Sequence, residues 1–282
     1  MLVTTEELLE DAQAGGYAVG QFNTSTWEIT KAIIQAAQRL QSPIILATSE
    51  GELSHFGPKY LVEIAKIASK EAGIPLAVHL DHGKSLKMAL ACLEVGYTSV
   101  HIDGSELPFE ENIALTLAVV EAAHGIGASV EGELGKIPKR AYEKEEKTKR
   151  QLTDPQEAKK FVESTGVDLL AVSIGNTHGA YKGKTKIDYK RLSEIRKLVN
   201  IPLVLHGGSL IPNSDIKKLI EAGITKINVN TDLRLAATST LRGVLDENLD
   251  EYVPYKILGA VVDRVQEVVE EKIKLFGSAK KG

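Results

Sequence analysis

The residues best suited to chemistry lie in Leu76–Gly83, where an apolar run ends in a carboxylate, an imidazole and a glycine. Asp81 could accept a proton, and His82 beside it could ligate a metal ion in the same small volume. In α/β folds, chemistry is placed at strand ends because the sheet holds these residues rigid while the loops leave them accessible. The pair therefore marks a candidate site, for which other strand ends should supply partners.

Polar residues follow the other apolar runs as well. Each lies at the carboxyl end of a predicted strand or just beyond it, and in a barrel these ends surround one mouth. The set comprises Asn23, Ser49, Asp81, His82, Asp103, Glu133, His178, the run His206, Gly207, Gly208, Ser209, and the run Asn228, Val229, Asn230, Thr231. This convergence is the strongest functional signal in the sequence.

Three histidines of this set, His82, His178 and His206, suit a zinc ion. Catalytic zinc takes about three protein ligands and leaves one position open for the substrate. Asp103 and Glu133 could hold a displaced or second ion.

The remaining histidines are expected to be structural. His79 and His101 lie inside predicted strands and should pack in the core. His55 lies in a loop and His124 at a helix end, and neither is placed in the site.

Two loops, after the seventh and eighth predicted strands, resemble a phosphate cradle. Glycines such as those of Gly207-Gly208-Ser209 let backbone N–H groups approach an anion, and the N-terminus of a following helix adds its dipole. In a barrel, the loops after the seventh and eighth strands are the usual phosphate site. The second loop is formed by Asn228–Thr231.

Apolar strands and amphipathic helices alternate along the whole chain, which predicts a (β/α)8 TIM barrel. The strands are short, continuous and often β-branched, as in a parallel sheet covered on both faces. A doubly wound open sheet is the competing fold, and no Gly-x-Gly-x-x-Gly follows the first strand to support it. The predicted strands are 17–22, 43–48, 76–80, 99–102, 128–134, 169–174, 203–205 and 224–229.

We expect a single domain over residues 1–282, with a helical extension after the barrel. Pro254 begins a last helix, about 254–276, whose valines recur at helical spacing. This apolar stripe should pack on the barrel or on a neighbouring subunit. Near the start, Thr4 and Glu7 fit a helix capping box.

The composition is that of a soluble globular protein, with 43% hydrophobic and 26% charged residues. A formal charge of −4 implies no basic face, so nucleic acid is not an expected partner. No apolar run approaches the roughly 18 residues of a membrane span, and the N-terminus does not read as a signal peptide. Cys92 is the single cysteine, which favours a cytoplasmic location.

With these motifs, the sequence resembles the class II, zinc-dependent ketose-bisphosphate aldolases, a family that includes fructose-bisphosphate aldolases. The resemblance spans Tyr17 to about Ser278, and its motifs occur in the family's order. They are Leu80–Gly83, Ile102–Ser105, Glu131–Gly135, Gly175–Gly179, Leu205–Ser209 and Lys226–Thr231.

The resemblance implies His82, His178 and His206 as zinc ligands and Asp81 as the proton-transferring carboxylate. It places Asp103 and Glu133 at an alternative metal position. The remaining implied contacts bind dihydroxyacetone phosphate, through Gly179, Gly207–Ser209 and Asn228–Thr231. Members are usually homodimers or homotetramers, and many also bind Na⁺ or K⁺ near the phosphate.

The residue types agree with aldol cleavage. Zinc would stabilise the negative enediolate as a Lewis acid, Asp81 would take the proton of the C4 hydroxyl, and Asn228 could hydrogen-bond the developing charge. Class I aldolases use a lysine Schiff base instead, and the sixth predicted strand contains no lysine. Lys226 on the eighth strand has neighbours that fit phosphate binding, which makes it a poor substitute.

Two departures from the family pattern bear on the substrate. The family's Gly-Gly-x-Glu loop is absent, and Ala141 stands where its glutamate is expected. Glu143 is the nearest candidate to move the carbon-bound proton, with Glu145 and Glu146 as others. Tyr255 stands where many members carry an arginine for the far phosphate.

The first hypothesis is therefore reversible cleavage of a phosphorylated sugar, fructose 1,6-bisphosphate, to dihydroxyacetone phosphate and glyceraldehyde 3-phosphate. Tagatose 1,6-bisphosphate, which differs only at C4, or another phosphorylated sugar is the alternative. A metal-dependent hydrolase is a second class, but such barrels tend to carry His-x-His on the first strand, where this chain has Phe22-Asn23. A non-catalytic sugar-phosphate-binding relative is a third.

Overall fold

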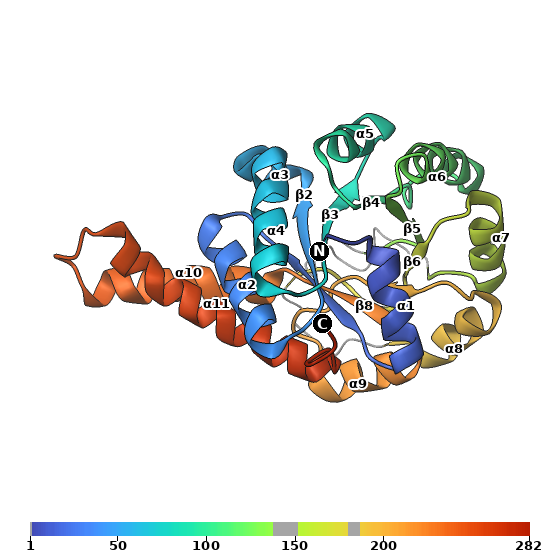
Figure 1. Ribbon diagram of the computed structural model, residues 1–282. Coiled ribbons are helices and arrows are strands. Elements are labelled where there is room, and N and C mark those ends of the chain that lie inside the picture. The colour runs from blue at the N-terminus through green and yellow to red at the C-terminus, as the bar shows by residue number, and fades with distance from the viewer. Residues whose placement is uncertain (1, 138–151, 180–186) are drawn as a thin grey trace.

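The computed structural model describes residues 2–137, 152–179 and 187–282. Its strands are parallel and close into a barrel in chain order, with helices around the outside (Figure 1). The predicted barrel is thereby confirmed. The strands are β1 Val19–Asn23, β2 Ile44–Ser49, β3 Leu76–Gly83, β4 Ser99–Ile102, β5 Ser129–Leu134, β6 Leu169–Val172, β7 Leu203–Leu205 and β8 Ile224–Val229.

A helix lies between each strand and the next. These helices, with α10 after the last strand, are α2 Trp27–Leu40, α4 Pro58–Ala72, α5 Leu86–Val95, α6 Phe109–His124, α7 Pro155–Thr165, α8 Tyr189–Leu198, α9 Asn213–Glu221 and α10 Thr231–Glu247. The described residues also form helices α1 Thr5–Gly15, α3 Glu50–Phe56 and α11 Pro254–Phe276. The short helix α3 was not predicted, because it has no apolar stripe. Its signal in the sequence is the capping box of Ser49 and Glu52.

Helix α1 closes the amino-terminal end of the barrel. The predicted capping box holds its start, since Thr4 and Glu7 exchange hydrogen bonds. Its apolar side contributes Leu8, Leu9 and Ala12 to an inner core with strand residues such as Val19 and Ala77. This plug leaves the carboxyl ends of the strands as the open mouth.

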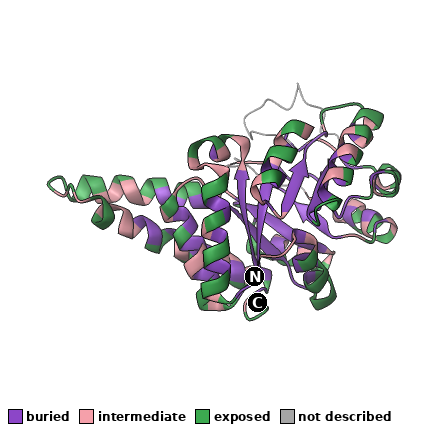
Figure 2. Cartoon of the chain, turned by 45° about the horizontal axis from the view of Figure 1, so that its top comes forward, coloured by how far each residue is buried: buried purple, intermediate pink, exposed green. Residues whose placement is uncertain are grey.

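A second, larger core lies between the sheet and its surrounding helices. On β3, Val78 and Leu80 belong to this outer core, whereas Ala77 belongs to the inner one, as the alternation of strand side chains requires. The strands are buried along almost their whole length (Figure 2).

The last helix, α11, packs against α2 and α10. Its predicted apolar stripe is buried there, and each fully buried valine contributes about 1.5–3 kcal/mol. The antiparallel pair α10–α11 projects from the barrel (Figure 1). Within the described ranges, no helix is long and apolar enough to cross a membrane.

Candidate active site

The end of β3 brings two adjacent residues to the same site. Strand alternation would direct Asp81 into the barrel and His82 outward. His82, however, has a left-handed backbone with φ 54°, and the pairing of β3 with β4 shifts between Leu80 and Gly83. This bulge turns His82 back toward the mouth, so a carboxylate and an imidazole meet there.

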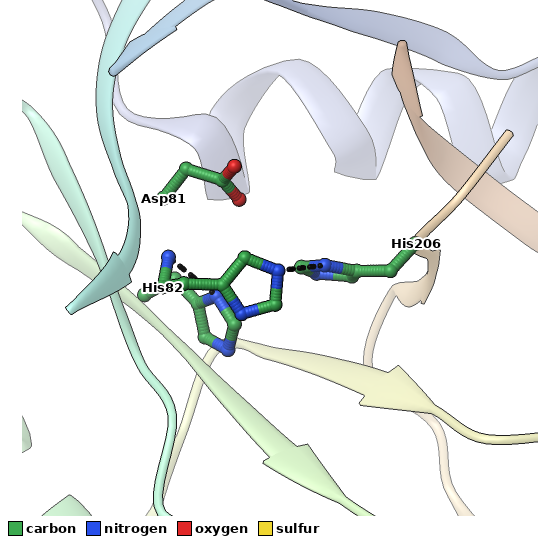
Figure 3. Close-up of side chains that lie close together, drawn as sticks. Asp81, His82 and His206 are labelled. Atoms are coloured by element: carbon green, nitrogen blue, oxygen red, sulfur yellow. Dashed lines mark hydrogen bonds between the residues drawn. The ribbon is translucent and has the colours of Figure 1, made fainter. Parts of the chain in front are cut away.

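His82 faces His206, which follows β7. Nε2 of His82 lies 3.0 Å from Nδ1 of His206 (Figure 3). The other nitrogen atom of each ring faces a carboxylate: Nδ1 of His82 lies 3.0 Å from Asp103, and Nε2 of His206 lies 2.7 Å from Glu131. Those carboxylates hold the hydrogens of the neutral imidazoles, so the two facing nitrogen atoms present lone pairs to each other.

Two lone pairs so close together require a positive charge between them. A shared proton can supply it, and so can a metal ion, which binds imidazole nitrogen at about 2.0–2.1 Å. A carboxylate on the outer nitrogen of a ligating histidine is the usual support of zinc sites. The donor set of His82 and His206 therefore fits a divalent ion.

His178, after β6, completes the group predicted from the sequence. Its ring centre lies 5.0 Å from that of His82 and 5.7 Å from that of His206, while the latter two rings are 4.6 Å apart. The structure thus brings together three histidines that are distant in the chain. The His82 side chain retains 22% exposure and His206 none, so an ion held by them would lie at the floor of the mouth.

His101 adds a fourth imidazole that the sequence interpretation placed only in the core. It is fully buried on β4, as predicted, but it also belongs to a potential ligand group with Asp81, His82 and His206. Its Nδ1 accepts the backbone N–H of His82 at 3.1 Å. Its Nδ1 lone pair is therefore already engaged by the backbone of His82.

Asp81 lies beside the histidines and is held by two amides. Asn23 donates to Oδ2 at 2.9 Å, and Asn228 donates to Oδ1 at 3.2 Å. Burial alone would raise the pKa of Asp81, but its electrostatic interaction with the imidazoles of His82 and His206 outweighs burial and holds that pKa well below its usual range. Asp81 is therefore ionised, the form that can accept a proton.

A buried ion pair beneath the mouth escaped the sequence analysis. Lys226, fully buried on β8, lies 2.7 Å from Oε2 of Glu131 and donates to Oδ1 of Asn228 at 2.9 Å. Since lysine only donates, it fixes the amide of Asn228 with its NH₂ toward Asp81. The available signal was a lysine and a glutamate inside otherwise apolar strands.

A second potential ligand group lies beside His82 and contains the predicted residues Asp103 and Glu133. Lys84 pairs with Asp103, and the hydrogen bond from His82 overrides burial to lower the pKa of that carboxyl. Burial and the neighbouring Asp103 raise the pKa of Glu133 to about 8. Oε2 of Glu133 is buried without a hydrogen-bond partner, as a metal ligand would be.

Burial and neighbouring carboxylates shift the pKa values of the site histidines in opposite directions. Burial lowers the pKa of His206 and of His101, the latter to about 3. Burial also acts to lower the pKa of His82, but Asp81, Asp103 and Glu133 outweigh it and raise the value to about 9. A proton shared at this site therefore belongs to His82.

The predicted phosphate loops pack tightly on each other. Gly207 has φ 69°, and a β-carbon there would lie 2.1 Å from the carbonyl oxygen of Thr177. Gly208 donates its N–H to the carbonyl of Asn228, and the hydroxyl of Ser209 accepts the N–H of Asp232. The N–H of Gly208 is thus engaged within the protein and links the two predicted phosphate loops.

Ser49 and Asn23 meet at Glu52 of helix α3. Both donate to Oε2 of this buried glutamate, while Asn230 and Arg234 donate to its Oε1. The predicted substrate contacts of β1, β2 and β8 thereby share one hydrogen-bond network beside Asp81.

Two predictions fall elsewhere. Glu143 lies outside the described residues, as do Glu145 and Glu146. Tyr255 lies at the start of α11 and is 77% exposed. His124 lies at the end of α6, as predicted, and contacts Asp168. His55, which was predicted in a loop, instead lies near the end of helix α3 and is exposed.

A closed β/α barrel with histidines and carboxylates at its carboxyl mouth, arranged so that they could hold a metal ion, defines the class of barrel enzymes. The model of the family "Fructose-bisphosphate aldolase class-II" matches residues 3–281. The chain belongs to this class II aldolase family.

Individual relatives agree along their whole length. A fructose-bisphosphate aldolase of Thermus caldophilus is 46% identical over 302 residues, covering 99% of this chain and 99% of that protein. One from Staphylococcus aureus (strain Mu50) is 42% identical over 283 residues, covering 99% and 98%. The crystal structure of the YdjI aldolase from Escherichia coli K12 has a TM-score of 0.88 and 35% identity, covering 100% and 99%.

Proposed function

We propose that this chain, as one barrel domain over residues 1–282, is a zinc-dependent aldolase. It would cleave fructose 1,6-bisphosphate reversibly to dihydroxyacetone phosphate and glyceraldehyde 3-phosphate. The observation that carries this proposal is the contact between His82 and His206, with a carboxylate behind each ring and Asp81 alongside.

His82, His178 and His206 are the proposed ligands of the ion, and Asp103 with Glu133 would offer an alternative position. A bound zinc ion would supply Lewis-acid stabilisation of the negative charge that develops on the ketone fragment. Asp103 and Glu131 would keep the two imidazoles oriented, because each holds the hydrogen of the ring's outer nitrogen.

Asp81 is the proposed general base. Cleavage between C3 and C4 requires the C4 hydroxyl to lose its proton as the bond breaks, and Asp81 is ionised beside the metal ligands. The amides of Asn23 and Asn228 hold its two oxygen atoms and thereby set the direction of the carboxylate. It would therefore act beside the ion as a base.

Asn228 would hydrogen-bond the developing negative oxygen. Its NH₂ group is oriented by Lys226, which occupies the amide oxygen, so a donor is preorganised near Asp81. Preorganised donors in a buried site contribute because they need no reorganisation during the reaction.

For the substrate, Gly179, Gly207–Ser209 and Asn228–Thr231 would bind the phosphate of dihydroxyacetone phosphate. Asn23 and Ser49 would contact the other half of the sugar. Fructose is favoured over tagatose because the curated relatives named above are fructose-bisphosphate aldolases. Glu143 remains the proposed carrier of the carbon-bound proton, and Na⁺ or K⁺ is a proposed second cation. The proposed setting is a cytoplasmic homodimer or homotetramer.

The test is metal removal in a coupled assay of fructose 1,6-bisphosphate cleavage. Chelation should abolish cleavage, Zn²⁺ should restore it, and borohydride with substrate should trap no covalent adduct. Tagatose 1,6-bisphosphate, assayed in parallel, should be cleaved more slowly. Turnover that persists after complete metal removal, or a borohydride adduct, would refute the proposed mechanism.

A further inference from the structure

At the bulge where β3 pairs with β4, strand β3 has one residue more than β4. Leu80 pairs with Val100 and Gly83 pairs with Ile102, so two residues of β3 lie opposite His101 alone. Such an irregularity interrupts the ladder of backbone hydrogen bonds. A buried backbone N–H inside it must find another acceptor.

For His82, that acceptor is a side chain. Its N–H donates to Nδ1 of His101 at 3.1 Å. His101 is fully buried, and its ring centre lies 4.9 Å from the ring of His82. Because Nδ1 accepts, the hydrogen of the neutral ring is on Nε2, which faces Oε2 of Glu133 at 3.6 Å.

We propose that His101 is a positioning residue that holds the β3 bulge, and with it the left-handed backbone of His82. A residue with a β-carbon is disfavoured in that conformation, so it needs a fixed contact to persist. His101 would thereby determine where Nε2 of His82 lies relative to His206. This inference rests on the proposed function, in which His82 is a metal ligand.

The ring of His101 could instead only fill space in the core. Variants that keep a hydrogen-bond acceptor at the position of Nδ1 and variants that do not will separate this packing role from the positioning role. In His101→Asn, the amide oxygen can take the place of Nδ1 and accept the N–H of His82. In His101→Gln, the acceptor lies farther out, near Glu133, and His101→Leu fills the volume without any acceptor. If His101 positions the bulge, the Asn variant should bind the metal ion more tightly than the Leu variant. If the ring only fills space, the Leu variant should do better than the Asn variant.

The experiment measures the dissociation constant for Co²⁺ and the visible spectrum of the Co²⁺-loaded chain, with urea unfolding of each metal-free variant. Changes in residues that orient metal ligands typically cost 10- to 100-fold in metal affinity. We expect His101→Leu and His101→Gln to weaken Co²⁺ binding by about that factor and to shift the spectrum. His101→Asn should bind at least about tenfold more tightly than His101→Leu.

Val100→Ala is the matched control. Val100 is buried on the same strand but in the outer core, so its truncation should lower stability without changing the Co²⁺ spectrum. If His101→Leu does not fold, the comparison of Asn with Gln tests the same geometry.

The inference is overturned if the Leu variant binds Co²⁺ as tightly as the Asn variant, or if Asn and Gln are equivalent. Failure of the proposed function is a separate result, because the unmodified chain would then neither bind the ion at His82 nor cleave the sugar.

Discussion

Nζ of Lys226 lies 2.7 Å from Oε2 of Glu131 in the barrel interior, and both side chains are fully buried. Glu131 also holds Nε2 of His206, and Lys226 also holds Asn228. One ion pair therefore orients a proposed metal ligand on one side and a proposed catalytic amide on the other. Removal of either charge would leave its partner buried and uncompensated.

Lys226→Met should destabilise the metal-free chain by about 3–5 kcal/mol, the range for breaking a buried pair from one side. Lys226→Met combined with Glu131→Leu should recover much of that loss, because neither charge of the pair is then left without its partner. Urea unfolding with a chelator present measures both. A double variant that is as unstable as the sum of its single variants would show that the pair does not couple.

Asp81→Asn should retain metal and lose turnover. The amide cannot accept a proton, and general-base catalysis contributes about 10²- to 10⁴-fold. Steady-state kinetics and metal analysis of the same sample provide the test. Near-normal turnover in Asp81→Asn would remove Asp81 from its role.

Asp103→Asn is the contrasting variant. It should weaken metal binding by about 10- to 100-fold, because Asp103 orients His82.

The raised pKa of His82, about 9, predicts opposite pH trends for stability and metal affinity. His82 keeps its proton in the folded metal-free chain up to a pH of about 9, whereas in the unfolded chain it releases that proton above pH 6.5. The bound proton therefore stabilises the folded chain. This contribution to the free energy of unfolding is complete below pH 6.5 and is lost as the pH rises through 9, by up to about 1.4 kcal/mol per pH unit. The pKa of Glu133 is raised from 4.5 to about 8, so this group also makes the folded chain less stable as the pH rises between those two values.

Metal binding displaces the proton from His82, so the affinity for Zn²⁺ should rise by up to about tenfold per pH unit between pH 7 and 9. Competition with a chelating dye at several pH values measures this trend. An affinity that stays constant over this range would contradict the assignment of the proton to His82.

Gly207→Ala should disrupt the predicted phosphate loop. Its added β-carbon would lie 2.1 Å from a backbone oxygen of Thr177, and its φ of 69° disfavours alanine. We expect a loss of stability and a higher KM for dihydroxyacetone phosphate in the condensation direction. Gly243→Ala on helix α10 meets nothing within 4 Å and should instead stabilise by about 0.5–1 kcal/mol. Equal effects of the two substitutions would argue against a tight loop at Gly207.

The barrel could be predicted because each strand is a short apolar run followed by an amphipathic helix. The mouth followed from the same pattern, since the polar residues come where those runs end. His178 and His206 lie near His82, as that argument requires. The prediction needed only the rule that parallel strands bring their carboxyl ends together.

The missing parts depend on contacts between strands. Nothing local in the sequence marks the bulge at His82, because it arises from the pairing of β3 with β4. The acceptor role of His101 follows from that pairing and was missed with it. Lys226 and Glu131 were visible as charges within strands, but only the barrel register shows that they meet.

The bulge at the end of β3 links the placement of the proposed base, Asp81, to that of the proposed metal ligand, His82. Asp81 and His82 reach the same site only because one backbone irregularity lies between Leu80 and Gly83. Insertion or deletion of a single residue there would rotate the base and the ligand out of place together. Divergence in this part of the barrel is therefore restricted to exchange of side chains at constant length, and evolutionary change in segment length must occur in other loops.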